Sequence, residues 1–345
     1  MSKKYILLMT LGCLAIFLSA CQFGQTKGDN VVTIYSERHY DVDQELYDAF
    51  TESTGIQVQV VRDGADQLMT RLENEGTDSP ADLLIIADVG RIHQAKEQGL
   101  LQTSTSEILD ANIPSKYRDS EDYWYGLTKR ARVLVYHPDR VDVSDLSTYE
   151  ALTEEVWQGR VITRTSTNIY NQSLMASFIA IHGREAAQEW AAGLVANFAR
   201  DPQGNDRDQA KAVVAGDADV AIMNTYYIGR MLYSSDPFEV EVAQTVRVFF
   251  PNQETTGTHV NISAGGITKY APNKENALRL LEFLSQPEQQ AIYAEANFEY
   301  PIHPDVEPHA LLKSWGDFIA QDIPLYVLGQ HSTEATIVMN EVGWK

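Results

Sequence analysis

Tyrosines occur in three short segments that each follow an apolar run of the chain. These segments are residues 37–40, the stretch around Tyr170, and the pair at residues 226–227. A phenolate is a hard, anionic oxygen donor, and ferric ion is a hard acceptor that lowers the pKa of a phenol far below its ordinary value of ~10. One such tyrosine alone is more often a packing residue at a strand end, but several together with a histidine fit a ferric cage. The candidate ligands are His39, Tyr40, Tyr170, Tyr226 and Tyr227.

Each of the three segments lies where a strand is expected to end. Residues 31–36, 160–164 and 219–223 are short runs rich in apolar residues, as buried strands are. Open α/β sheets bind ligands beyond the carboxyl ends of their strands. The three tyrosine segments are therefore expected to face one cleft.

The rest of the chain supports this arrangement, because predicted strands and helices alternate along it. Residues 131–136 are predicted to form a strand that carries the chain from one domain to the next, and residues 246–250 a strand that returns toward the first. Such alternation predicts the α/β class, with two doubly wound lobes joined by crossing strands around a central cleft. The other predicted strands are residues 56–60 and 81–87, and the helices lie near residues 42–50, 68–72, 90–98, 172–182, 184–199, 209–215 and 276–284.

Length and charge narrow the class of protein. The chain has 345 residues, which suggests two domains, and 44% of them are hydrophobic, as in an ordinary packed globule. Its 27 Lys+Arg against 48 Asp+Glu give a formal net charge of −21. This excess of negative charge argues against binding to nucleic acid or to anionic lipid surfaces, and it weakly favours cationic ligands.

The amino terminus predicts export. Residues 1–20 have the layout of a signal peptide, with lysines before an apolar run. The tetrapeptide Leu18-Ser19-Ala20-Cys21 resembles a bacterial lipobox, in which Cys21 is acylated and becomes the first mature residue. Residues 21–30 then form a flexible tether, and the protein lies at the periplasmic or cell-surface face of the cytoplasmic membrane. A plain signal peptide or an uncleaved anchor helix is the alternative.

The tyrosine segments also resemble those of a known family. The sequences Tyr-Ser-Glu-Arg-His-Tyr at 35–40, Asn-Ile-Tyr-Asn-Gln-Ser-Leu at 168–174 and Asn-Thr-Tyr-Tyr at 224–227 are similar to the ferric-ion-binding proteins of bacterial ABC iron importers, most of all the cyanobacterial Fut type. Framework segments strengthen the resemblance over nearly the whole mature chain: residues 136–141, 147–150, 157–161, 207–213 and 265–269.

This resemblance implies a class II periplasmic-binding-protein fold whose two lobes close on one Fe(III). The family's His-Tyr pair falls on His39 and Tyr40, its second-lobe tyrosine on Tyr170, and its Tyr-Tyr pair on residues 226–227. In similar proteins the histidine coordinates in some forms only. The first lobe is expected to comprise residues 31–130 plus about 250–300, and the second residues 131–249 plus about 301–345.

Positive side chains near the ligands are the expected counter-charges. Four phenolates on Fe(III) leave the centre near −1, and some relatives use an arginine from the segment matching residues 129–132 to hold a carbonate. A carbonate or other small anion is thus a possible companion of the iron, although the presence of Tyr40 can make it unnecessary. The candidates for this outer role are Arg38, Arg130 and Arg230, with Arg132 less favoured; the alternative for each is a solvated surface arginine.

The implied function is capture of Fe(III) and its delivery to an ABC permease of the inner membrane by a monomeric, non-enzymatic protein. One alternative is a binding protein of the same fold for a polyamine, thiamine or an oxyanion. The other is an exported enzyme using Asp63 or Asp88, but the sequence has no H-E-x-x-H, G-x-S-x-G or P-loop motif.

Overall fold

The computed structural model describes residues 30–345. The predicted signal peptide, Cys21 and nearly all of the tether lie outside the described residues. Within the described part, no helix is long and apolar enough to span a bilayer.

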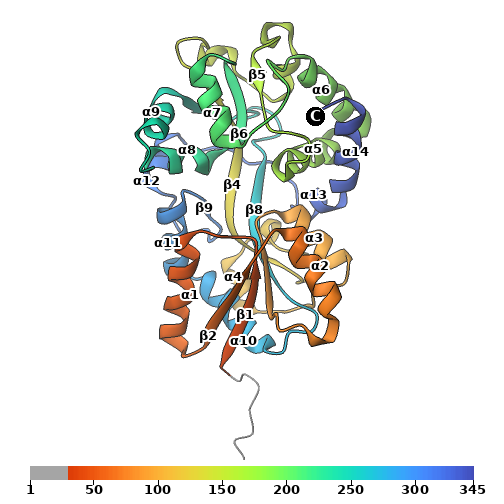
Figure 1. Cartoon of the computed structure of the whole chain (residues 1–345), viewed down its shortest axis with the longest axis vertical. Coiled ribbons are helices and arrows are strands. Elements are labelled where there is room, and N and C mark those ends of the chain that lie inside the picture. The colour runs from red at the N-terminus through yellow and green to blue at the C-terminus, as the bar shows by residue number, and fades with distance from the viewer. Residues whose placement is uncertain (1–29) are drawn as a thin grey trace, which may run out of the picture.

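The chain forms two α/β lobes that are stacked along the long axis of the molecule (Figure 1). At the lower end β1 pairs in parallel with β2 and β3, as predicted for a doubly wound lobe. The elements of this first part are β1 (Val31–Ser36), α1 (Asp41–Thr54), β2 (Gln57–Arg62), α2 (Ala65–Glu75), η1 (Gly76–Asp78), β3 (Leu83–Ile86), α3 (Val89–Glu97), α4 (Glu107–Asn112) and η2 (Ser115–Tyr117).

At the upper end β6 lies between β5 and β4, parallel to β5 and antiparallel to β4. The elements here are η3 (Val143–Asp145), η4 (Glu150–Thr153), η5 (Glu155–Trp157), β5 (Val161–Ile162), α5 (Ile169–His182), α6 (Arg184–Ala196), α7 (Asp206–Ala215), β6 (Val220–Asn224), α8 (Thr225–Leu232), α9 (Pro237–Thr245) and β7 (Arg247–Phe249). The last stretch of chain adds α10 (Lys274–Leu284), α11 (Pro287–Asn297), β9 (Tyr300–Pro301), α12 (Ala310–Ser314), α13 (Tyr326–Gln330) and α14 (Ser332–Glu341).

Two long strands connect the lobes, and one of them differs from the prediction. β4 (Tyr125–Tyr136) passes between the lobes as expected, but the strand predicted at residues 246–250 is the short β7, which pairs with the far end of β4. The strand that reaches the first lobe is β8 (Val260–Ile267), which pairs with both β3 and β4 in antiparallel fashion. The sheet is consequently mixed, in the order β2-β1-β3-β8-β4-β6-β5.

Glycine explains why β8 can lie at the centre of this sheet. A Cβ atom on Gly266 would stand 2.7 Å from the carbonyl oxygen of Tyr123, and one on Gly265 would stand 2.8 Å from the side chain of Leu281. Both distances are closer than packed atoms tolerate. The glycines thus allow backbone and helix to approach β8 from its two faces.

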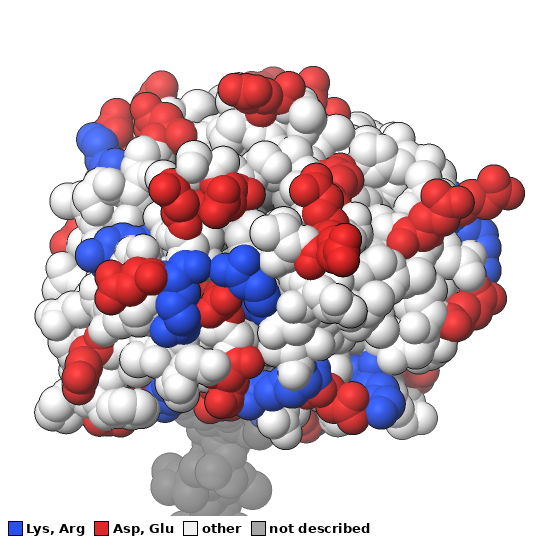
Figure 2. Space-filling model, turned by 90° about the horizontal axis from the view of Figure 1, so that it is seen from above, with Lys and Arg blue, Asp and Glu red and all other residues white. Residues whose placement is uncertain are grey.

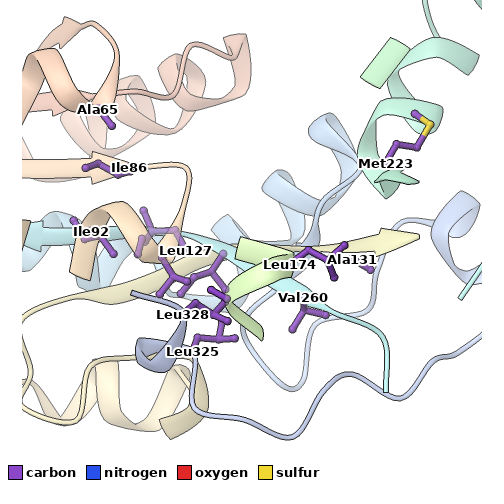
Figure 3. Close-up of a cluster of buried hydrophobic side chains, with 14 of the residues drawn as sticks. Ala65, Ile86, Ile92, Leu127, Ala131, Leu174, Met223, Val260, Leu325 and Leu328 are labelled. Atoms are coloured by element: carbon purple, nitrogen blue, oxygen red, sulfur yellow. The ribbon is translucent and has the colours of Figure 1, made fainter. Parts of the chain in front are cut away.

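One hydrophobic cluster runs through both lobes along the crossing strands. Figure 3 shows Ala131 of β4, Val260 of β8 and Leu174 of α5 close together, with Leu325 and Leu328 beside the first-lobe side chains. All five are fully or almost fully buried. Both lobes therefore pack against the same hydrophobic cluster along β4 and β8, which determines where the loops at the strand ends meet.

Charged side chains are distributed over the surface. Figure 2 looks onto the second-lobe end and shows Asp and Glu side chains spread over that face with Lys and Arg among them. Ion pairs of this lobe include Asp219 with Arg140 and Arg160, each at 2.6 Å. Such partly exposed pairs contribute little to stability.

Candidate metal site

The candidate tyrosines all stand at the beginnings of helices that follow strands. Tyr40 immediately precedes α1, Tyr170 is the second residue of α5, and the pair at residues 226–227 lies in the first turn of α8. The first turn of a helix carries a partial positive charge from its unpaired N–H groups. Three helix starts therefore favour negative oxygen atoms at the same place.

The structure brings the four phenol groups together from both lobes. The hydroxyl oxygens of Tyr170 and Tyr226 lie 3.3 Å apart, and the rings of Tyr226 and Tyr227 stack with centroids 4.2 Å apart. Tyr40 reaches the same cluster from the first lobe, because both Tyr170 and Tyr226 influence the pKa of its hydroxyl. Tyr226 is buried and the other three are partly exposed.

This environment keeps the phenols protonated in the absence of a cation. Burial, and then Glu299 and Tyr170, raise the pKa of Tyr40 to about 12. Burial and the neighbouring tyrosines likewise raise the pKa values of Tyr170 and Tyr226, and burial followed by Asp206 raises that of Tyr227. A buried cation of high charge would reverse this preference for the protonated phenols, because it binds the deprotonated oxygens.

His39 lies at the exposed edge of the cluster. Its ring centroid is 4.9 Å from that of Tyr40, and its Nδ1 lies 3.4 Å from the backbone oxygen of Glu37. The side chain is exposed. His39 is thus next to the phenols without being enclosed by them.

Arginines surround the phenols, and they are not the solvated surface residues that the sequence left as an alternative. Arg38, Arg130 and Arg132 are only 1–2% exposed, and Arg230 is partly buried. The guanidinium carbon of Arg230 lies 4.5 Å from the ring centroid of Tyr40, and that of Arg38 lies 5.1 Å from it. The corresponding distances from Arg130 and Arg132 to the ring of Tyr170 are 5.5 and 5.9 Å.

A buried ion-pair network holds Arg38 in place. Its Nε donates to Asp43 at 2.9 Å, and its Nη1 donates to Glu299 at 3.0 Å and to Ser263 at 2.8 Å. Burial alone would raise the pKa of Glu299, but Arg38 and Arg130 hold it below its ordinary value. No local pattern marks Glu299 as a partner of Arg38, because the two residues are far apart along the chain.

A second buried network positions the second-lobe tyrosines. Asp206, at the start of α7, accepts hydrogen bonds from Arg132 at 2.8 Å and from Arg164 at 2.9 Å. Arg132 also donates to Asn171 at 2.6 Å, next to Tyr170. Arg164 was missed as a site residue because the sequence analysis placed it inside the strand predicted at residues 160–164, whereas β5 ends at Ile162 and the guanidinium carbon of Arg164 lies 5.7 Å from the ring centroid of Tyr170.

Asp88 has a structural role that accounts for its burial. Its Oδ1 accepts from the backbone of Gly90 at 2.8 Å, which caps α3, and its Oδ2 accepts from Ser173 and Asn261, each at 2.7 Å. These bonds join the end of β3 to α5 in the second lobe. These hydrogen bonds explain the burial of Asp88 without a role as the acid or base of an enzyme.

The donor set is rich in oxygen. Among residues 30–345 no group of three or more His, Cys, Asp or Glu side chains is placed to hold a metal ion. The phenol oxygens are clustered donors of the described residues, and hard oxygen donors match a hard trivalent ion better than a soft one.

Comparisons with known proteins agree with this chemistry. The family model described as bacterial extracellular solute-binding protein matches residues 36–291. Iron uptake protein A1 of Synechocystis sp. is 47% identical over 314 residues, covering 91% of this chain and 87% of the relative. Iron uptake protein A2 of the same organism is 44% identical over 316 residues, covering 91% and 90%. The structure of Trichodesmium FutA (IdiA) in complex with iron and citrate ligands has a TM-score of 0.89 and 47% identity, covering 91% of this chain and 100% of that one.

Proposed function

Because this chain belongs to the bacterial extracellular solute-binding proteins, we propose that it captures Fe(III) outside the cytoplasm and delivers it to an ABC permease. Its relatives carry names that refer to iron uptake and ferric-iron binding. The observation that carries the proposal is the convergence of four phenols from two lobes, with 3.3 Å between the hydroxyls of Tyr170 and Tyr226.

The proposed ligands are the four phenolates of Tyr40, Tyr170, Tyr226 and Tyr227, with His39 as a fifth from the exposed edge. These tyrosines are far apart along the chain, but each stands at the start of a helix. The first turn of each helix carries partial positive charge, which favours a phenolate oxygen. An ion that displaces four phenol protons also removes the cost of burying the ionised oxygens, since it pairs with them directly.

The arginines balance the charge of the loaded centre. Four phenolates on Fe(III) leave about one negative charge, and Arg38, Arg130 and Arg230 stand near the rings of Tyr40 or Tyr170. We assign them to this outer role, which other metal sites fill with similar hydrogen-bonding groups. A carbonate or another small anion is not required for neutrality when all four phenols bind.

Capture proceeds by closure of the lobes. The first lobe comprises residues 31–130 plus about 250–300, and the second comprises residues 131–249 plus about 301–345. The second-lobe tyrosines bind iron first, and Tyr40 and His39 complete the shell as the lobes approach and water leaves. The closed shape is the one that a permease recognises.

Release is expected to follow reduction, because Fe(II) has lower charge and is a softer acceptor, so that it loses most of its attraction to phenolate. Anaerobic reduction of the loaded protein should free the metal to a ferrous chelator. Full retention of the metal after reduction would contradict this step.

An optical titration tests the assignment of the ligands. Fe(III) added as a weak chelate should produce a red or orange phenolate-to-iron charge-transfer band, and the double change Tyr226→Phe plus Tyr227→Phe should abolish or strongly shift it. Tyr233→Phe is the matched control, because Tyr233 is 67% exposed and lies just beyond α8. Failure to form a band in the unchanged protein, or an unaltered band in the double variant, would refute the assignment.

The location is extracytoplasmic, as in the family. We propose further that residues 1–20 are a signal peptide, that Cys21 carries a lipid anchor, and that residues 21–30 tether a monomeric body to the membrane. The lipobox-like tetrapeptide that ends at Cys21 supports this. A monomer is the simplest form for a protein that must open, close and dock.

A further inference from the structure

A polar groove opens next to β4, and two of its lining residues, Tyr300 and Leu312, pack in the same buried cluster as Tyr226. Lys129 and Arg130 are neighbours on this strand, so their side chains leave it on opposite faces. Arg130 points to Tyr170, whereas Lys129 lines a groove of about 390 Å³. Residues of η2, β9, α12 and the chain after α12 form its walls, which include Lys116, Tyr117, Lys129, Tyr300, Lys313 and Asp317.

Two lysines in this groove converge on one ring. The Nζ atoms of Lys116 and Lys129 lie 5.1 and 5.2 Å from the ring centroid of Tyr117, which is almost fully buried. Within residues 30–345 neither lysine has a carboxylate within 4 Å, and neither donates a side-chain hydrogen bond. Lys116 is exposed to solvent, whereas Lys129 is partly buried, so it is the ammonium group of Lys129 that most lacks a counter-charge.

A buried polar atom of the same groove also lacks a partner. The hydroxyl of Tyr300, a residue only 5% exposed, makes no hydrogen bond in the described structure, although Tyr300 pairs with Lys129 across β9 and β4. Buried hydroxyls are nearly always hydrogen-bonded. An acceptor that entered the groove would satisfy it.

The remaining charges of the groove leave its inner part positive. Lys313 is neutralised by Glu307 at 2.9 Å, and both are exposed. Asp317 is an exposed group at the rim that opposes an anion. Burial, and then Lys116, lower the pKa of Lys129 to about 8, as expected for an ammonium group without a counter-charge.

We propose that this groove binds a small oxyanion, a phosphate or a carboxylate, between the ammonium groups of Lys116 and Lys129, with the Tyr300 hydroxyl as a third donor. The anion supplies the missing counter-charge, and charge-assisted hydrogen bonds of this kind are among the stronger ones in proteins. The site uses other donors than the proposed iron site, although Tyr300 packs in one cluster with Tyr226, and the proposal does not rest on iron binding.

The test uses metal-free, full-length mature protein with ¹³C-labelled lysine side chains. Inorganic phosphate and acetate are titrated separately, with sodium chloride at the same ionic strength as reference. Saturable shifts of the Lys116 and Lys129 signals are expected, with no shift of Lys269, whose Nζ lies 5.3 Å from the ring of Tyr270 outside the groove. A response to phosphate alone or acetate alone supports the proposal and identifies the anion.

Substitutions separate a site from a general ion effect. Lys129→Met and Lys116→Met should each weaken anion binding at least about tenfold, whereas Lys269→Met, which removes the same charge, should leave it unchanged. Anion binding should also weaken as the pH rises above about 8, because Lys129 then loses its proton. Shifts equal to those with chloride, or equal binding by all three variants, would overturn the proposal.

Discussion

The hydroxyl oxygens of Tyr170 and Tyr226 lie 3.3 Å apart although the two residues belong to different helices. Each is the second residue of its helix. Helix α8 begins directly after β6, and helix α5 begins after the loop that follows β5. Because both residues belong to the second lobe, their pairing does not require the first lobe. This fits the proposed order of capture, in which the second-lobe tyrosines bind the metal ion first.

Iron binding is predicted to release about four protons per ion at neutral pH. The raised pKa values of the four tyrosines mean that the metal-free phenols hold their protons, which Fe(III) must displace. Affinity should consequently rise with pH and fall in acid. A pH-stat titration, corrected for the chelate alone, measures the number.

Each single change of a ligand tyrosine to phenylalanine should lower this count by about one, whereas Tyr233→Phe should leave it at four. Release of fewer than two protons by the unchanged protein would show that most of the phenols do not coordinate.

Arg230→Met is predicted to weaken iron binding about 5- to 10-fold without abolishing the charge-transfer band. Its guanidinium lies 4.5 Å from the ring of Tyr40 and donates to Asn297 at 2.8 Å, so it contributes charge and position but no metal bond. Competition with a weak chelator measures the change. Arg71→Met is the control, because the guanidinium carbon of Arg71 lies 4.8 Å from the ring centroid of Tyr35, which is not a candidate ligand. An equal loss of iron affinity in both variants would contradict a specific role of Arg230.

Glu299→Gln is predicted to lower the free energy of unfolding by about 2 to 3 kcal/mol at pH 7, since it takes a carboxylate from the buried Arg38 while leaving Asp43. Urea unfolding of metal-free protein measures this. The exposed Glu307→Gln should change it by less than about 0.5 kcal/mol.

The same pair has a predicted pH dependence. The pKa of Glu299 is held below its unfolded value, so its stabilisation is present above that value and is lost as pH falls through the folded pKa. The difference between the unchanged protein and Glu299→Gln should shrink in acid. A difference that grows as the pH falls would contradict the ion-pair explanation.

Gly229→Ala is predicted to hinder closure. Gly229 lies in α8 between the ligand pair and Arg230, and a Cβ atom there would stand 2.5 Å from the ring of Phe298, which follows α11. The variant should bind iron more weakly and show a larger radius of gyration with iron by small-angle scattering. Gly193→Ala makes a similar clash with Thr153 inside the second lobe, and it should reduce stability without changing the iron-dependent compaction.

Cys21→Ala is predicted to abolish lipid attachment and leave an unprocessed precursor, whereas Cys13→Ala should be processed normally. Mass spectrometry of the amino-terminal peptide from the membrane fraction measures both outcomes. An unmodified mature terminus in the unchanged protein would indicate a plain signal peptide instead.

The convergence of the tyrosines could be predicted because their positions follow a local rule. Residues 31–36 and 219–223 are runs rich in apolar residues, and the candidate ligands at 39–40 and 226–227 lie in the short segments that follow them, so one local pattern marks both the strand ends and the ligands. β1 indeed covers Val31–Ser36, and β6 differs by one residue at each end.

The parts that were missed depend on contacts between distant segments. β8 contains Asn261, Ser263 and two glycines, which have low strand propensity, and it becomes a strand because β3 and β4 lie on either side of it. The ion pair between Arg38 and Glu299 also joins distant segments, and the sequence around either residue does not indicate the other. Residues buried by tertiary packing carry little local pattern to predict from.

The central place of β8 also determines when the protein can fold during synthesis. Leu83 of β3 pairs with Ile267, so the sheet of the first lobe has an empty central position until most of the chain has been made. Contacts that join such distant residues form slowly. A chain that emerges amino-terminus first thus remains incompletely folded until late, which is the state that a translocation channel for unfolded polypeptides accepts.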